Sequence, residues 1–215
     1  MLSKRIMLEA VFAVCAGALQ AATVLVEAES FPDRGGWVVD QQFMDQMGSP
    51  FLMAHGLGQP VRDAAAVTTV PETGNYRVLA RTRNWAAPWS RKDAPGQFQV
   101  LVNGAPLANV LGAGGADWEW LEAGTVPLKK GKAWLALHDL TGFNGRCDAL
   151  ILTSDAAFKP ENEVAKLETF RRQMGAITPS PETERVDLII AGGGIPGVCM
   201  AISAARLGLK VALIQ

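Results

Sequence analysis

The sequence predicts a multidomain protein with a β part followed by an α/β part. From residue 23 to residue 155, short runs of β-branched and aromatic residues alternate with Gly, Pro, Asn and Asp, without a long helical period. Residues 156–185 change to helix formers and then to prolines, and from residue 186 an apolar run enters a glycine-rich turn. We therefore expect a two-sheet β-sandwich, a linker helix and a βαβ unit.

Composition narrows the class of ligand. Of the 215 residues, 49% are hydrophobic, which is enough to bury a core. The 20 basic and 21 acidic side chains give a net charge of -1, and no long run of either sign occurs. This excludes the charge pattern of a nucleic-acid or membrane-surface binder, so a small or neutral partner is expected.

The first 21 residues are expected to form a signal peptide. Lys4 and Arg5 precede an apolar run over residues 6–19 that is too short to span a bilayer, and small residues follow. A retained N-terminal anchor or a buried first helix is the alternative. Cleavage would send the protein to the periplasm or the extracellular space, with no stable membrane span.

The cysteines and histidines show no metal or disulfide spacing. The three cysteines, Cys15, Cys147 and Cys199, fall in separate regions, so no iron–sulfur ligands are visible. We expect Cys147 and Cys199 to be buried as small apolar side chains. His55 and His138 have no partnered spacing and are expected to be structural.

Residues 22–155 are expected to form the sandwich. Tyr76, Val78 and Ala80 recur at every second position, so one face of their strand points inward. The Asn-Gly pair at 103–104 suits a tight turn with positive φ. The candidate strands are 23–28, 36–40, 51–54, 66–70, 75–83, 97–103, 124–127, 133–139 and 147–153.

A set of short motifs recurs in order through this region. They are Glu27-Ala28-Glu29, VPETGNYRV at 70–78, VNG at 102–104, LKKG at 128–131 and DALIL at 148–152. Together they resemble the galactose-binding-like jelly rolls found among carbohydrate-binding modules, over residues 26–154. The resemblance implies a structural calcium held by Glu27, Glu29 and Asp148, whose hard oxygens suit that ion. Solvated edge carboxylates are the alternative.

The sequence contains six tryptophans. An exposed tryptophan can form part of a sugar-binding site, since aromatic faces stack on pyranose rings. Trp85 and Trp89 lie in a polar loop at 84–96 and are expected to be exposed. They would contact either a saccharide or another domain. Trp37, Trp118 and Trp134 are expected in the core, and Trp120 is left open.

Residues 156–185 are expected to form a helix and a linker. Pro160 and Glu161 open the helix and Gly175 ends it, before an extended segment with two prolines. Apolar residues recur along one stripe, and charged residues, Arg171 and Arg172 among them, flank it. The stripe is Val164, Leu167, Phe170 and Met174.

Residues 186–215 carry the pattern Gly-x-Gly-x-x-Gly between an apolar strand and a helix, followed by a second apolar strand. Gly192 permits a tight turn, Gly194 lets the backbone approach a pyrophosphate, and Gly197 lets the helix pack closely on the strand. The helix N-terminus offers free N–H groups to phosphates. A glycine-rich turn without a ligand is the alternative.

The run AGGGIPGVCMA at 191–201, continued by AARLG at 204–208, resembles the FAD-binding start of glutathione-reductase-like flavoproteins. It is closer still to exported FAD-dependent oxidoreductases that join a β-sandwich to a Rossmann-type FAD-binding domain. The resemblance implies FAD, with only the start of that domain in this chain. Gln215 stands where such flavoproteins usually place a Glu for the adenosine ribose. The implied pyrophosphate site is Gly192, Gly193, Gly194, Ile195, Pro196 and Gly197.

Two functions remain open. The favoured one is the N-terminal part of an exported FAD-dependent oxidoreductase with a carbohydrate-related substrate, whose chemistry belongs to the flavin. The alternative is a carbohydrate-binding or assembly module without its own catalysis. No catalytic residue is predicted in either case.

Overall fold

The computed structural model describes residues 21–90, 94–176 and 185–214. Residues 1–20 of the expected signal peptide and Gln215 lie outside these ranges. The chain divides into two compact units, residues 1–177 and 178–215. Among the described residues, none of the helices combines the length and hydropathy that a membrane crossing requires.

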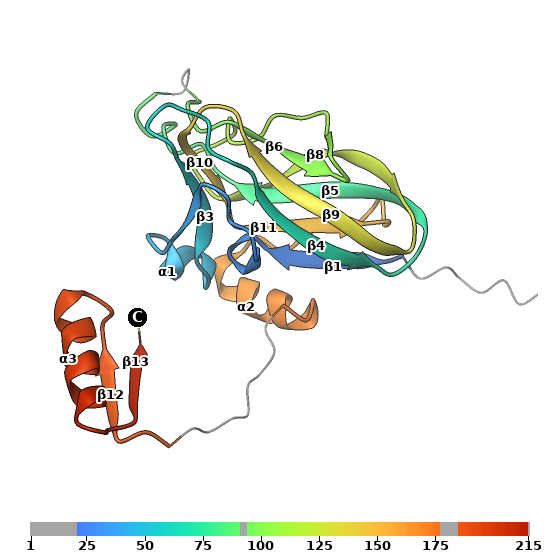
Figure 1. The fold of residues 1–215 in the computed structure, drawn as a ribbon. Coiled ribbons are helices and arrows are strands. Elements are labelled where there is room, and N and C mark those ends of the chain that lie inside the picture. The colour runs from blue at the N-terminus through green and yellow to red at the C-terminus, as the bar shows by residue number, and fades with distance from the viewer. Residues whose placement is uncertain (1–20, 91–93, 177–184, 215) are drawn as a thin grey trace, which may run out of the picture. The chain divides into compact units, whose positions relative to one another are not determined.

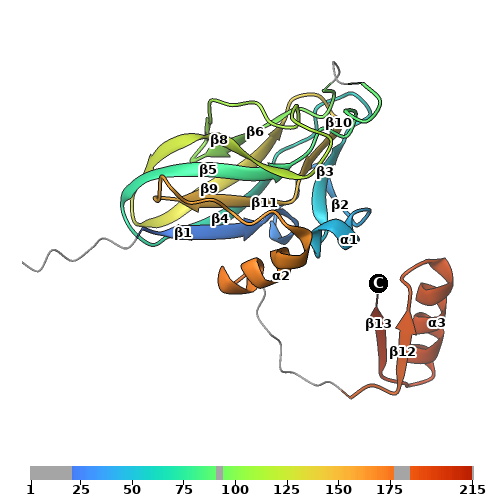
Figure 2. The same ribbon diagram turned by 180° about the vertical axis from the view of Figure 1, so that it is seen from behind.

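The first unit is a β-sandwich of two four-stranded sheets with a smaller third sheet (Figures 1 and 2). Every strand pair in it is antiparallel. The first sheet runs β1 (Thr23–Glu27), β11 (Ala149–Thr153), β5 (Gly74–Thr82) and β8 (Glu119–Leu128). The second runs β4 (Ala64–Val70), β9 (Gly131–Asp139), β6 (Phe98–Val102) and β7 (Ala105–Pro106). The third runs β10 (Phe143–Cys147), β3 (Phe51–His55) and β2 (Trp37–Asp40).

The core of the sandwich follows the predicted alternation. Tyr76, Val78 and Ala80 of β5 are fully buried in a cluster with buried side chains from β4, β6, β8, β9 and β11, and the partly buried Val26 of β1 packs against it. Burying a side chain such as that of Val78 stabilises the fold by about 1.5 to 3 kcal/mol. The opposite face of β5 is also covered. Arg81 is buried there because the segment that precedes the last helix of this unit lies over it, and Arg81 Nε donates to Asn162 Oδ1 at 3.0 Å.

Several strand boundaries differ from the prediction. β8 begins at Glu119 instead of residue 124, and β7 and β10 were not predicted. The predicted strand 147–153 divides at Asp148, because Cys147 ends β10 in the third sheet while Ala149 begins β11 in the first. The turn at 103–104 is confirmed, since Asn103 and Gly104 both have positive φ, 50° and 83°.

Three short helical segments belong to this unit. They are η1 (Ala28–Ser30), α1 (Met44–Met47) and α2 (Val164–Gln173). The prediction that the last of these opens at Pro160 is wrong: Glu161 instead accepts from the N–H groups of Asn162 and Glu163, ahead of the first helical residue. Both views place α2 beside α1, and α2 buries Leu167 and Arg171 (Figures 1 and 2).

The second unit is a βαβ arrangement. β12 (Leu188–Ala191) leads through the glycine turn into α3 (Ile195–Arg206), and β13 (Val211–Ile214) returns parallel to β12. This strand–helix–strand order is the one predicted. Ile190 faces α3 and is buried, whereas Ile189 on the other face of β12 is 61% exposed. The sheet thus has one covered face and one bare face among the described residues.

Candidate functional sites

An aromatic loop connects β5 to β6. Trp85 stacks on Phe143 of β10 with ring centroids 5.7 Å apart and planes 19° apart, and its Nε1 donates to the carbonyl of Phe143 at 2.9 Å. Trp89 meets the edge of Trp85 at 6.2 Å and is 80% exposed. Trp89 is therefore exposed as predicted, while Trp85 is half-buried because Phe143 covers one face. We name Trp85, Trp89 and Phe143 the aromatic loop cluster.

Two arginines lie behind this cluster. The Arg146 guanidinium lies 6.0 Å from the Trp85 ring and 5.6 Å from the Phe43 ring, and Arg83 lies 4.7 Å from the Phe43 ring. Burial, and then the neighbouring charge of Arg83, lowers the pKa of Arg146 to about 10. Arg146 therefore links the Trp85 ring to Phe43 through cation–π contacts, and Arg83 adds a contact to Phe43. The sequence showed no sign of them, because Arg146 lies in a strand that was not predicted.

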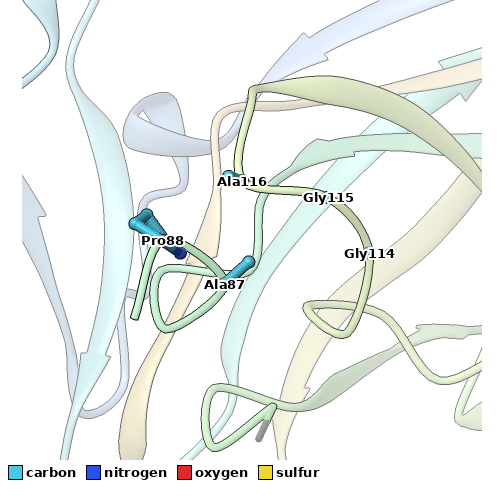
Figure 3. A pocket seen from close by; sticks show the side chains of 5 residues that line it. All are labelled: Ala87, Pro88, Gly114, Gly115 and Ala116. Carbon is cyan, nitrogen blue, oxygen red and sulfur yellow. The ribbon is translucent and has the colours of Figure 1, made fainter. Parts of the chain in front are cut away.

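A cavity of about 490 Å³ opens between the aromatic loop and the segment before β8 (Figure 3). The two segments are joined by a hydrogen bond from the Asn84 N–H to the Gly115 carbonyl at 2.9 Å. Glu119 Oε1 accepts from the Gly115 N–H at 2.7 Å and holds the second segment in place. Small side chains leave the backbone accessible in this cavity, whose lining is Ala87, Pro88, Gly114, Gly115 and Ala116.

The other tryptophans divide between core and surface. Trp37 and Trp118 are buried as predicted, at 3% and 4% exposure. The prediction that Trp134 is buried is wrong: it is half-buried, because its neighbours Ala133 and Leu135 fill the inward positions of β9 and leave Trp134 on the outer face.

Trp120 lies against α2. Its Nε1 donates to the Glu161 carbonyl at 3.0 Å, and its ring meets the edge of Phe170 at 6.5 Å. This tryptophan, which the sequence left open, therefore serves to pack the helix on β8 and is not part of the aromatic loop cluster.

The acidic residues at the two ends of the sandwich sequence meet in space. Oxygens of Glu27, Glu29 and Asp148 lie within 4.8 Å of one another. Glu27 ends β1, Glu29 lies in η1, and Asp148 lies between β10 and β11 with no exposed surface. We name these three residues the acidic cluster. Its juxtaposition follows from the antiparallel pairing of β1 with β11, which sets Glu27 opposite Ala149.

Two buried arginines already pair with this cluster. Arg81 Nη1 donates to Asp148 Oδ2 at 3.0 Å. Arg171 Nη2 donates to both Asp148 oxygens, at 2.9 and 2.8 Å, and Arg171 Nε lies 2.8 Å from Glu27 Oε1. Ser49 Oγ also donates to Asp148 Oδ1 at 3.1 Å. Asp148 is thus hydrogen-bonded through both oxygens by three side chains.

The two glutamates are less well satisfied. Glu27 Oε2 and Glu29 Oε2 are buried without a hydrogen-bond partner among the described residues. Burial raises the pKa of Glu27 to about 7 against the opposing charge of Arg171. Burial, and then the charge of Glu27, raises the pKa of Glu29 to about 8.

The acidic cluster has carboxylate oxygens, which are suitable ligands for calcium, but too few of these oxygens are free. Calcium takes about 6 to 8 oxygens, whereas Arg171 already contacts Glu27 and Asp148, and the buried oxygens without a partner among the described residues are Glu27 Oε2 and Glu29 Oε2. While Arg171 is docked, these residues do not fit a calcium ion. Calcium at Glu27, Glu29 and Asp148 stays a prediction.

The glycine loop of the second unit has specific steric demands. Gly192 has φ +108°, which disfavours any side chain, and its N–H donates to the Ile214 carbonyl at 2.7 Å. A Cβ at Gly197 would lie 1.9 Å from the Gly192 carbonyl oxygen. By contrast, a Cβ at Gly194 would meet only Pro196 Cδ, at 3.8 Å. The fold therefore requires glycine at Gly192 and Gly197 but tolerates a side chain at Gly194.

Gly194 precedes the first turn of α3 and has an extended backbone. An open cavity of about 470 Å³ lies beside this turn, lined by β12 and by Gly192, Gly194, Gly197 and Met200. Ile195, at the start of the helix, is 83% exposed. Gly193 lies within the same loop, and Pro196 occupies the first turn, where a missing N–H costs no hydrogen bond.

The cysteines and histidines have no catalytic arrangement among the described residues. Cys147 is buried, and burial raises the pKa of its thiol well above the ordinary value. The prediction that Cys199 is buried is wrong, because it lies on an exposed face of α3.

Each histidine bonds one neighbouring side chain. His55 Nδ1 lies 2.8 Å from Asn144 Oδ1, and His138 Nδ1 lies 2.8 Å from Asp63 Oδ1. Both contacts lie at the surface of the sandwich, and each fits a structural role.

No family model and no curated protein matches the sequence. Among solved structures, the chain is similar to the GH26-CBM35 β-(1,4)-mannanase of Podospora anserina, with 16% identity and a TM-score of 0.50 over 89% of this chain and 41% of that one. It is also similar to a family 35 carbohydrate-binding module of Clostridium thermocellum, with 15% identity and a TM-score of 0.47 over 61% and 97%. The comparison with the mannanase shows a shared fold: a β-sandwich of the carbohydrate-binding-module type.

Proposed function

We propose that the β-sandwich binds a saccharide at the aromatic loop cluster. The observation that carries this proposal is the 80% exposure of Trp89 beside a ring pair that is already fixed in place. A large exposed aromatic ring costs hydration free energy unless a partner covers it, and pyranose faces stack on such rings. The mannanase that shares the fold carries a family 35 carbohydrate-binding module, which supports the same ligand class.

The rigidity of the cluster favours binding. Phe143 stacks on Trp85, Arg146 makes a cation–π contact with the same ring, and Trp85 in turn contacts Trp89 edge to face. A preorganised platform loses little conformational entropy when the ligand arrives. The neighbouring cavity, lined by small residues such as Gly114 and Ala116, leaves room for a sugar ring beside the cluster.

Trp89→Ala is expected to weaken saccharide binding at least tenfold, which corresponds to about 1.4 kcal/mol, because the largest exposed ring is removed without disturbing the core. Binding is measured by calorimetry against a panel of soluble polysaccharides that bind the unaltered protein. Val67→Ala is the control, since Val67 is 59% exposed on β4 and lies in a sheet strand. An unchanged affinity in Trp89→Ala rules out the aromatic loop cluster as the site.

For the second unit we propose that Gly192–Gly197 holds the pyrophosphate of FAD, so that the chain is part of an exported oxidoreductase acting on a carbohydrate-related substrate. The favouring observation is Gly194, where a glycine stands although the fold leaves room for a side chain. A ligand close to the backbone explains that choice. The N–H groups at the start of α3 would bind the phosphates, and the flavin would supply the redox chemistry.

Gly194→Val tests this second proposal. The extended backbone at Gly194 and the 3.8 Å clearance allow the new side chain, so the helix content should persist while affinity for FAD falls at least tenfold. FAD binding is followed by quenching of flavin fluorescence, and the fold by circular dichroism. Ser203→Ala, in the last turns of α3, is the control.

The outcomes separate the two hypotheses. Because only the start of the expected FAD-binding domain lies in this chain, FAD binding here should be weak and should be strong in a longer protein that holds the whole domain. A longer protein that binds saccharide but no FAD supports the alternative of a binding or assembly module without its own catalysis. FAD binding that is equal in the unaltered protein and in Gly194→Val contradicts the assignment of the pyrophosphate to the glycine loop.

A further inference from the structure

Arg171 of α2 reaches into the centre of the acidic cluster. Its side chain is 3% exposed, and all three guanidinium nitrogens have acceptors. Nε faces Glu27, Nη2 donates to both oxygens of Asp148, and Nη1 donates to the Met47 carbonyl at the end of α1. One side chain thus joins the end of β1, the junction of β10 with β11, and two helices.

We propose that Arg171 serves as the cation of the acidic cluster in place of a metal ion, and that it anchors α2 to the sandwich. A planar guanidinium with five N–H donors can bond several acceptors at once in fixed directions. The space that a shared cation would need between Glu27 and Asp148 is the space that the guanidinium fills.

The charges support this assignment. Within the acidic cluster, Glu27 and Asp148 pair with Arg171, and Asp148 also pairs with Arg81; both arginines are buried. A divalent ion added to this set would lie against two guanidiniums at close range, in a poorly hydrated site where like charges repel strongly. Arg171 and calcium therefore exclude each other.

Thermal unfolding with added CaCl₂ or with EDTA tests the proposal. The melting temperature of the unaltered protein should be the same in both. Arg171→Met should lower it by roughly 10 °C, because breaking a buried ion pair leaves charges unpaired. Calcium should then raise the melting temperature of Arg171→Met, as the cluster becomes free to take an ion. The matched control is Arg172→Met, whose guanidinium is 49% exposed and pairs only with Glu168 on the same helix.

Hydrogen exchange distinguishes the anchoring of α2 by Arg171 from a general stabilisation of the sandwich. In Arg171→Met the amides of α2 should exchange faster, and calcium should not restore their protection, because an ion at the carboxylates has no bond to the helix. Should Arg171→Met fail to fold, Arg171→Lys serves instead, since a single ammonium cannot reach all the acceptors. The proposal is overturned if the melting temperature of the unaltered protein falls in EDTA or rises with calcium. It is also overturned if the Arg171 variant is as stable as Arg172→Met.

Discussion

Asp148→Ala is expected to lower the free energy of unfolding by about 3 to 5 kcal/mol. Asp148 has no exposed surface and pairs with Arg81 and Arg171, which are 2% and 3% exposed. Without the Asp148 carboxylate, two guanidiniums remain buried beside each other, and neither regains the hydration that it has in the unfolded chain. Urea unfolding monitored by tryptophan fluorescence measures the loss.

Two comparisons sharpen this prediction. Asp148→Asn keeps the shape and one acceptor oxygen but turns amide donors towards arginine donors, so it should lose nearly as much stability. Asp45→Ala, an exposed carboxylate in α1, should change stability by less than about 0.5 kcal/mol. A loss below about 1 kcal/mol for Asp148→Ala would show that the arginines find other partners.

The stability of the sandwich is expected to fall as the pH rises from about 5 to about 8. The folded-state pKa values of Glu27 and Glu29 are raised to about 7 and about 8, above the ordinary value of 4.5. The unfolded chain therefore releases these protons at lower pH than the folded protein does. Stabilisation is complete below the unfolded pKa and is lost as the pH passes through the folded values.

Glu29→Gln isolates this effect, because a glutamine matches the protonated glutamate in size and carries no charge. At pH 8.5 the variant should be more stable than the unaltered protein by roughly 2 to 4 kcal/mol, on a scale of about 1.4 kcal/mol for each pKa unit. Urea unfolding across the pH range, in EDTA, gives the two curves. They should converge near pH 4, and Glu168→Gln on the surface of α2 should follow the unaltered protein. Parallel curves for Glu29→Gln would contradict burial as the source of the pH dependence.

The sandwich was largely predictable because its strands repeat one simple pattern. Inward positions such as Tyr76 and Val78 are apolar, and the turn at 103–104 uses residues that accept positive φ. β10 escaped prediction because Asn144 has φ 62° and a bulge lies between Phe143 and Gly145, which breaks the alternation. The two residues of β7 are too few to show any period.

The sites were less predictable because their key contacts join distant segments. Short motifs pointed to Glu27 and Asp148 as members of one cluster. Arg171, by contrast, lies among the charged residues of a helix, and its sequence context is that of a surface residue. Only the packing of α2 on the sandwich reveals that it is buried. Likewise, the half-burial of Trp85 depends on Phe143, which is 58 positions away in the chain. The glycine loop is local in sequence, and its geometry was the most completely anticipated.

The pairing of the first strand with the last has a consequence for biosynthesis. Thr23 lies opposite Thr153, so within the described residues β1 pairs with β11 alone, at the far end of the sandwich sequence. During translation β1 emerges early and must wait, with its edge unpaired, until β11 has left the ribosome. Contacts so far apart in the chain close slowly, and an unpaired strand edge is open to pairing with other chains.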